Sequence, residues 1–185
     1  MLISKFKNAD VEQEILKVEE KYDIALPQQY KDFLCKYNGG HTPKTKFRVG
    51  KISSDIRAFY GLGEVPFSFR TLDMKEWIEN KLLPIGCDSF GNYILIGLSN
   101  EGYGKIYFSN HEAGDKLVCI GDDFISFLKH CKSDKISAAT KRSIKERETA
   151  LIAKGRGSII TDDLRKMWQD EIDKYGNMIQ EEVEL

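Results

Sequence analysis

Apolar residues recur at helical spacing in two segments near the start of the chain. The first segment follows Asp10, a suitable helix cap, and its apolar positions are Val11, Ile15, Val18 and Tyr22. The second segment begins at Leu26-Pro27, since proline is tolerated at the first helical position, and its apolar positions are Tyr30, Phe33, Leu34 and Tyr37. Asn38-Gly39-Gly40 then ends the helix, because glycine readily adopts the left-handed conformation that a helix terminus needs. The pattern predicts two short amphipathic helices that must pack on another element.

The middle of the chain alternates short apolar runs with turn residues, as an antiparallel sheet does. Phe47 and Val49 alternate with polar neighbours, and the further strand candidates are residues 58–60, 82–87, 93–98, 105–108 and 117–120. The run 93–98 is almost wholly apolar, which predicts a central strand covered on both faces. Two short helices are expected among these strands, one over residues 73–81 and one after Asp122 or Asp123. The prediction is an α+β fold in which an antiparallel sheet packs against helices.

The character of the sequence changes after residue 132. Residues 134–154 are polar and helical, with apolar positions too sparse for a broad core face, and Gly-Arg-Gly-Ser at 155–158 interrupts them. Thr161 then opens a last helix with one apolar side, formed by Leu164, Met167, Trp168, Ile172 and Tyr175. We therefore expect an α+β domain over residues 1–132 and a helical C-terminal extension over residues 133–185, docked on the domain or on a partner.

Composition and charge narrow the functional classes. Hydrophobic residues make up 41% and charged residues 31% of the 185 residues, with a formal net charge of -1, which is ordinary for a soluble globular protein. Opposite charges are mixed along the chain, which argues against nucleic acid or an anionic membrane as a direct partner. No apolar run approaches the roughly 20 residues that span a bilayer, and residues 1–7 lack the apolar region of a signal peptide. These features predict a cytoplasmic protein with reduced thiols.

Five segments, in order, carry a resemblance to a known family. The first contains Leu26, Pro27, Tyr30, Phe33, Leu34, Asn38, Gly39 and Gly40. The later segments are residues 83–88, 91–93, 104–107 and 110–112, and their motif positions are Asp88, Gly91, Asn92, Gly104, His111 and Glu112. Each segment alone is a weak pattern, but the ordered set over about residues 8–132 resembles the SUKH superfamily, in particular its Smi/Knr branch.

The resemblance implies a binding function rather than a catalytic one. Bacterial members of the family are thought of as immunity proteins that bind the toxin domains of contact-dependent or secreted polymorphic toxins. Fungal members act as scaffolding regulators of cell-wall synthesis. We therefore predict a non-enzymatic immunity protein that neutralises a cognate toxin of the nuclease type, without cofactor, metal or small-molecule substrate. The alternative is a regulatory scaffold that holds several partners.

Acidic residues are candidates for the contact with such a toxin. A nuclease toxin carries a basic cleft, and an acidic patch on its inhibitor would steer association toward that cleft. The candidates are Glu101, Asp115, Asp122 and Asp123. The competing interpretation is that these are helix caps and solvated loop charges. Trp168 and Tyr175 are a second possible anchor for a partner, unless they pack on the domain itself.

An enzymatic alternative would join His111 and Glu112 to Asp88, with His41 as a further candidate. These residues lie far apart in sequence, and no ligand spacing of a known metal site forces them to converge. We favour the interpretation that Asp88, Asn92 and His111 stabilise turns through hydrogen bonds between side chain and backbone. The four cysteines stand at apolar positions, where a buried thiol is inert, and they are Cys35, Cys87, Cys119 and Cys131.

Overall fold

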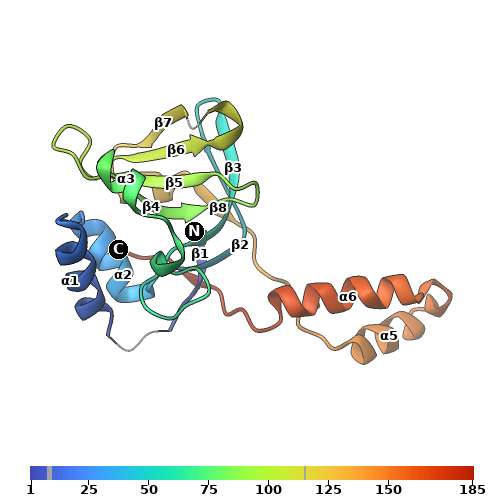
Figure 1. Ribbon diagram of the computed structural model, residues 1–185. Helices are drawn as coiled ribbons and strands as arrows, with labels where there is room; N and C mark the ends of the chain where they lie inside the picture. Colours follow the sequence, from blue (N-terminus) through green and yellow to red (C-terminus); the bar gives the residue numbers. More distant parts are fainter. Residues whose placement is uncertain (8–9, 115) are drawn as a thin grey trace. The chain divides into compact units, whose positions relative to one another are not determined.

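A nine-stranded antiparallel sheet forms the centre of the larger of two units in the computed structural model, which describes residues 1–7, 10–114 and 116–185. The larger unit comprises Met1–Asp134 and Glu181–Leu185, and the smaller unit comprises Lys135–Gln180. The sheet and the helices packed on it make the larger unit α+β, which confirms the predicted fold class (Figure 1).

The strands of the sheet follow the order β7-β6-β5-β4-β3-β2-β1-β9, and β8 pairs with β2. Their bounds are β1 Leu2–Lys5, β2 Gly40–Val49, β3 Ile52–Phe59, β4 Leu82–Cys87, β5 Tyr93–Gly97, β6 Ile106–Asn110, β7 Lys116–Gly121, β8 Cys131–Ser133 and β9 Glu181–Glu182. From β2 to β7 each strand pairs with the next one along the chain. Strand β5 is central, and Ile94, Leu95 and Ile96 are fully buried, as the two-sided apolar run predicts.

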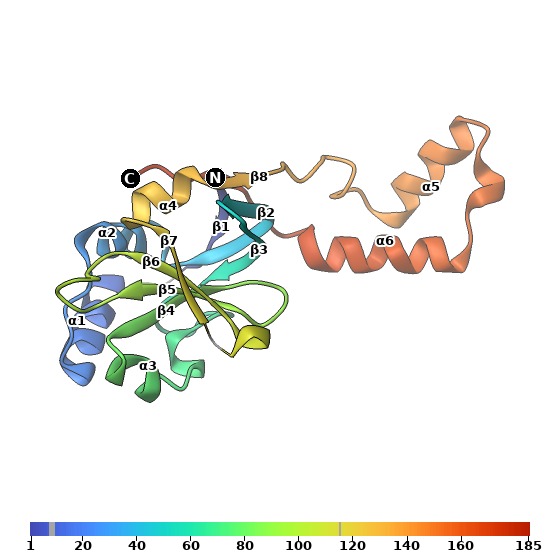
Figure 2. The same ribbon diagram turned by 90° about the horizontal axis from the view of Figure 1, so that it is seen from above.

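Helices cover the sheet of the larger unit. Their bounds are α1 Val11–Tyr22, α2 Gln28–Tyr37, α3 Lys75–Glu79 and α4 Phe124–Lys129. Helices α1 and α2 lie side by side in both views (Figures 1 and 2). The Phe33 ring of α2 lies 5.3 Å from Phe59 of β3 and 5.0 Å from Phe124 of α4, measured between ring centroids. Aromatic side chains therefore join α2 and α4 to the sheet. The apolar stripe predicted for α2 lies in the core.

The turn after α2 differs in detail from the prediction. Asn38, not a glycine, takes the left-handed position, with φ of 51°. Its side-chain amide donates to the Leu62 carbonyl at 3.0 Å and accepts from the Leu62 N–H at 2.8 Å, which compensates the strain of that conformation. Gly39 follows with φ of +72°, and a Cβ at this position would lie 2.6 Å from the Tyr60 carbonyl oxygen. Glycine is required here by both conformation and space.

Three short strands, β1, β8 and β9, were not predicted, and β9 changes the description of the C-terminal region. We expected residues 133–185 to form one extension, but the last five residues belong to the larger unit. Strand β9 pairs with β1, and the Tyr37 hydroxyl accepts a hydrogen bond from the Glu184 N–H at 2.9 Å. The smaller unit is thus inserted between β8 and β9.

The smaller unit is a helical hairpin. Helix α5 spans Ile144–Ala153 and is capped by Ser143, so it begins ten residues later than the helical run predicted over residues 134–154. Helix α6 spans Asp162–Tyr175 and is capped by Thr161, as predicted. Trp168 is the one large hydrophobic side chain that is buried among the described residues of this unit. No helix in the described part of the chain has both the length and the apolar character to cross a membrane.

Candidate partner-binding surface

Asp88, the first of the residues considered for catalysis, lies in a hydrogen-bonded turn between β4 and β5. Asp88 is 1% exposed, and its Oδ1 accepts from the backbone N–H groups of Phe90 and Asn92, both at 2.9 Å. Its Oδ2 accepts from Ser54 Oγ and from Asn92 Nδ2, both at 2.7 Å. The carboxylate is therefore occupied on both oxygens by groups that hold the turn, and little of it is left to bind a substrate.

His111 extends this cluster to the end of β6. Its N–H donates to Asn92 Oδ1 at 3.1 Å, and its Nδ1 lies 2.8 Å from the same oxygen, so the proton is on Nδ1. The neighbouring Glu112 is exposed, and His41, on β2, meets the rings of Phe6 and Phe67 edge-on. The hydrogen bonds of Asp88, Asn92 and His111 are those that the turn-stabilising interpretation requires.

Metal ligands and activated thiols are not assembled in the described residues. Within residues 1–7, 10–114 and 116–185, no three His, Cys, Asp or Glu side chains are placed to hold a metal ion. Burial raises the pKa of Cys131 to about 12 and also raises the pKa of Cys87. Partial burial, with Glu12 and Asp32 nearby, raises the pKa of Cys35. These shifts favour the unreactive thiol over the nucleophilic thiolate.

The expectation that all four cysteines are buried is wrong for two of them. Cys87 and Cys131 are buried, but Cys35 and Cys119 are exposed. Cys35 follows Leu34 on α2 and faces away from the core, and Cys119 lies on β7, at the end of the sheet order. An apolar neighbour in sequence does not place a cysteine on the buried face of a helix or strand.

The other motif residues serve the fold. Leu26, Tyr30, Phe33 and Leu34 are each at most 2% exposed and lie in the core. Pro27 is the N-cap residue of α2, and Gly91 and Gly104 have φ of +89° and +80°, which only glycine adopts without strain. Most of the motif residues therefore stabilise the fold and do not form a binding or catalytic site.

Three parts of the larger unit nevertheless meet around a surface pocket of about 270 Å³. They are the start of α2, the loop between β5 and β6, and the start of α4. The pocket, named here the α2–α4 pocket, is lined by Pro27, Gln28, Gln29, Tyr103, Gly104, Asp123 and Phe124. It brings two motif positions, Pro27 and Gly104, together with one predicted partner residue, Asp123.

Hydrogen bonds fix the walls of the α2–α4 pocket. Gln29 Oε1 accepts from the Ile125 N–H at 3.1 Å, which ties α2 to α4. Asp123 Oδ1 accepts from the Ser126 N–H at 2.6 Å, and Ser126 Oγ accepts from the Asp123 N–H at 3.1 Å, so that a capping box starts α4. Because these groups are already ordered, a partner would bind here without the entropic cost of ordering them.

Tyr103 is the exposed aromatic residue of the α2–α4 pocket. Its side chain is 46% exposed, in a loop that also exposes Glu101. Asp122 is exposed beside Asp123, whereas Asp123 uses its carboxylate as the cap. Asp115, the remaining acidic candidate, lies outside the described residues. The sequence prediction does not include Tyr103, although a large aromatic residue between Gly102 and Gly104 in a polar loop indicates an exposed ring.

Comparison with known proteins finds a match to one family model. A scan against protein-family models matches residues 11–130 to the SMI1 / KNR4 family (SUKH-1), which is more than half of the chain. The matched range includes every residue that lines the α2–α4 pocket. No curated protein and no solved structure matches the chain significantly.

Proposed function

The chain belongs to the SMI1 / KNR4 family (SUKH-1), and on this basis we propose that it is an immunity protein that binds and blocks a cognate protein toxin. The family match over residues 11–130 carries the proposal. The toxin that we propose is of the nuclease type, and the encounter takes place in the cytoplasm. Neutralisation is stoichiometric binding, and it uses neither a cofactor nor a catalytic residue of this chain.

The polar clusters of the larger unit support binding over catalysis. A general base needs a free lone pair within reach of substrate, but both oxygens of Asp88 accept hydrogen bonds from groups that hold the β4–β5 turn. A nucleophilic cysteine needs a lowered pKa, whereas the pKa is raised for Cys35, Cys87 and Cys131. These groups are suited to holding the fold.

The α2–α4 pocket is the contact surface that we propose for the toxin. Tyr103 is the anchor, because a partly exposed aromatic ring on a fixed loop contributes large contact area at a small entropic cost. Glu101 and Asp122 supply exposed negative charge beside it. Such charge attracts the basic cleft of a nuclease and raises the association rate, while the ring and the pocket set the dissociation rate.

Co-expression tests the function and the surface together. The full chain is expressed with a candidate toxin domain, chosen as the C-terminal domain of a large protein from a neighbouring gene, and growth and co-purification are scored. The test variant is Tyr103→Ala, and the matched control is Phe90→Ala, which removes a 70% exposed ring from the β4–β5 turn instead.

The wild type and Phe90→Ala are expected to restore growth and to co-purify with the toxin domain, and Tyr103→Ala to do neither. Rescue by Tyr103→Ala at the wild-type level would move the contact elsewhere on the chain. Continued killing with no complex for the wild type would remove the immunity role for that pair, and pull-downs would then address the scaffold role.

A further inference from the structure

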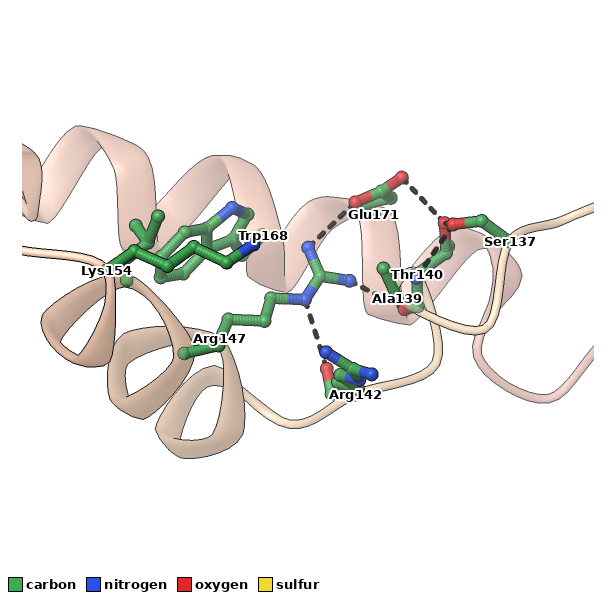
Figure 3. Close-up of a pocket in the computed structure, with 10 residues that line it drawn as sticks. Ser137, Ala139, Thr140, Arg142, Arg147, Lys154, Trp168 and Glu171 are labelled. Carbon is green, nitrogen blue, oxygen red and sulfur yellow. Dashed lines mark hydrogen bonds and ion pairs between the residues drawn. The ribbon is translucent and has the colours of Figure 1, made fainter. Parts of the chain in front are cut away.

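One arginine and one tryptophan hold the helical hairpin of the smaller unit together. The Arg147 side chain is 10% exposed, and its Nη1 lies 2.8 Å from Glu171 Oε2. Its Nη2 and Nε donate to the carbonyl oxygens of Thr140 and Arg142 at 2.6 and 3.1 Å, as Figure 3 shows. The guanidinium lies 5.8 Å from the ring centroid of Trp168. The Arg147–Glu171 pair therefore fixes the register of α5 against α6.

Two adjacent hollows, of about 250 and 530 Å³, follow one flank of α5. Arg142 and Ala150 line both of them. Lys154 and Trp168 contribute to the first hollow (Figure 3). Glu146 and Ala153 contribute to the second. Arg142 and Lys154 are exposed, and neither forms an ion pair within the described ranges of the chain. This flank thus has small side chains at its centre and charged ones along its length.

The exposed flank of α6 has the opposite character. Residues at steps of four, three and four are all exposed, and they are Asp163, Met167, Asp170 and Lys174. Met167 is 57% exposed, which is unusual for a large apolar side chain between charged neighbours. In the part of the chain that the structure describes, Asp163 and Asp170 form no ion pair. The flank of α6 therefore presents a protruding apolar side chain and carboxylates without an ion pair. The flank of α5 presents hollows and cations without an ion pair.

The register of the hairpin sets these features at matching levels. Because α5 and α6 are antiparallel and Arg147 pairs with Glu171, each step forward along α5 corresponds to one step back along α6. The Glu148–Arg165 pair joins the same two helices in a register five residues away, so the two pairs bracket the levels. Asp163 lies within the bracket for Lys154, which covers residues 159–164, and Met167 lies within the bracket for Ala150, which covers residues 163–168. A two-fold axis parallel to the helices keeps these levels and places α6 of one copy over α5 of the other.

We propose that two copies of this chain associate through their hairpins, with α5 of each copy packed against α6 of the other. In this pairing Met167 enters the hollow over Ala150 and Ala153, and Lys154 pairs with Asp163. Each contact occurs twice, because the interface is isologous. The face offered by two short helices is smaller than a standard interface, so we expect the association to be weak.

A second copy fits this face better than nucleic acid does. The cations of α5 alternate with Glu146 and Glu148, and α6 adds Asp163 and Asp170 on the neighbouring flank. Those carboxylates would repel a phosphate backbone, which instead needs a continuous basic groove. The complementary face is on the chain itself. This inference goes beyond the immunity role and does not depend on it.

Charge reversal tests the association by sedimentation velocity of the full chain over a range of concentrations. Lys154→Glu and Asp163→Lys each place like charges opposite one another twice, so each alone is expected to weaken dimerisation about tenfold. An equimolar mixture of the two variants restores both ion pairs in the heterodimer, and so does the double variant in its own homodimer. Restoration therefore separates a contact from a mere loss of helix stability.

Apolar variants provide the second readout. Met167→Asp is expected to abolish the dimer, whereas Ile152→Asp, at a 62% exposed position on the other flank of α5, leaves it unchanged. Circular dichroism checks that each variant keeps its helices. A wild-type chain that stays monomeric up to about 1 mM, or a dimer that Lys154→Glu and Asp163→Lys leave unchanged, would overturn the inference.

Discussion

The buried carboxylate of Asp88 accepts two hydrogen bonds from Asn92, one from its backbone N–H at 2.9 Å and one from its side-chain amide at 2.7 Å. Asn92 in turn accepts from His111, so three polar residues that could suggest an active site hold two connections of the sheet. Polar residues of this kind can be essential to a protein without taking part in any reaction.

We expect Asp88→Ala to lower the free energy of unfolding by about 2–3 kcal/mol, because it leaves buried donors of Ser54 and Asn92 without an acceptor. Chemical denaturation measures the change. The control is Asp122→Ala, which removes an exposed carboxylate and should change stability by less than about 0.5 kcal/mol. Equal stability of the two variants would show that the Asp88 cluster does not support the fold.

Two glycines of the larger unit form a matched pair that tests how closely the backbone of another segment packs against a glycine Cα. Gly39 and Gly50 both have positive φ, +72° and +58°, but only Gly39 faces a backbone oxygen at 2.6 Å, since a Cβ at Gly50 would meet nothing within 4 Å. Gly50→Ala is expected to cost about 1 kcal/mol through conformation alone, and Gly39→Ala about 3 kcal/mol or more. Thermal unfolding of the two variants measures the difference, and similar melting temperatures would contradict the close approach.

His41 is expected to make stability depend on pH. Burial, followed by the charge of Arg57, lowers the pKa of His41. Folding therefore disfavours the protonated ring, and the contribution of His41 is complete above its ordinary pKa of about 6.5. It is lost as the pH falls from that value through the lower pKa of the folded state. We expect His41→Phe, which keeps an aromatic ring beside Phe6 and Phe67, to lose less stability than the wild type between about pH 7 and pH 5.

Urea titrations at several pH values measure this difference, because both proteins carry the same other titratable groups. Parallel stability profiles for the wild type and His41→Phe would mean that the ring of His41 does not change its protonation on folding.

The hairpin should open without unfolding the sheet when its central arginine is lost. Arg147→Met removes one partner of Glu171 and the guanidinium donors to two backbone carbonyls, and it removes the charge over Trp168. We expect amide hydrogen exchange in α5 and α6 to rise by about tenfold or more, with β4 and β5 unchanged, because local opening is confined to one unit.

The matched control for that experiment is Arg165→Met. Arg165 also contacts two carboxylates, Glu148 and Asp162, but its side chain is 43% exposed, so its ion pairs contribute less. A larger exchange increase in Arg165→Met than in Arg147→Met would reverse the order that burial predicts.

The sequence predicts the helices and strands that have long apolar patterns. It also predicts the motif residues that a particular backbone conformation requires. The spacing of Tyr30, Phe33 and Leu34 predicts α2, and the unbroken apolar run predicts β5, because such periodicity follows from burial. Strands β1, β8 and β9 span only two to four residues, too few for a period of two to be visible. Glu181 and Glu182 of β9 are also charged, which is typical of a solvated tail and not of a strand.

The contact surface is less predictable than the fold. Pro27, Tyr103 and Asp123 are far apart in sequence, and only the packing of α2 and α4 brings them to one pocket. The exposure of Cys35 likewise depends on which side of α2 faces the core. Surface residues that recognise a partner are not fixed by the fold, so neither their pattern nor their spacing identifies them.

Titration of the purified toxin domain with the purified chain tests the central claim most directly. Toxin activity is measured while the full chain is added, with Tyr103→Ala and Phe90→Ala titrated in parallel. Stoichiometric binding predicts that activity falls linearly and ends at equimolar chain for the wild type and Phe90→Ala, and that Tyr103→Ala needs a large excess. Full toxin activity at a large excess of the wild type, or complete inactivation by far less than one equivalent, would contradict neutralisation by binding.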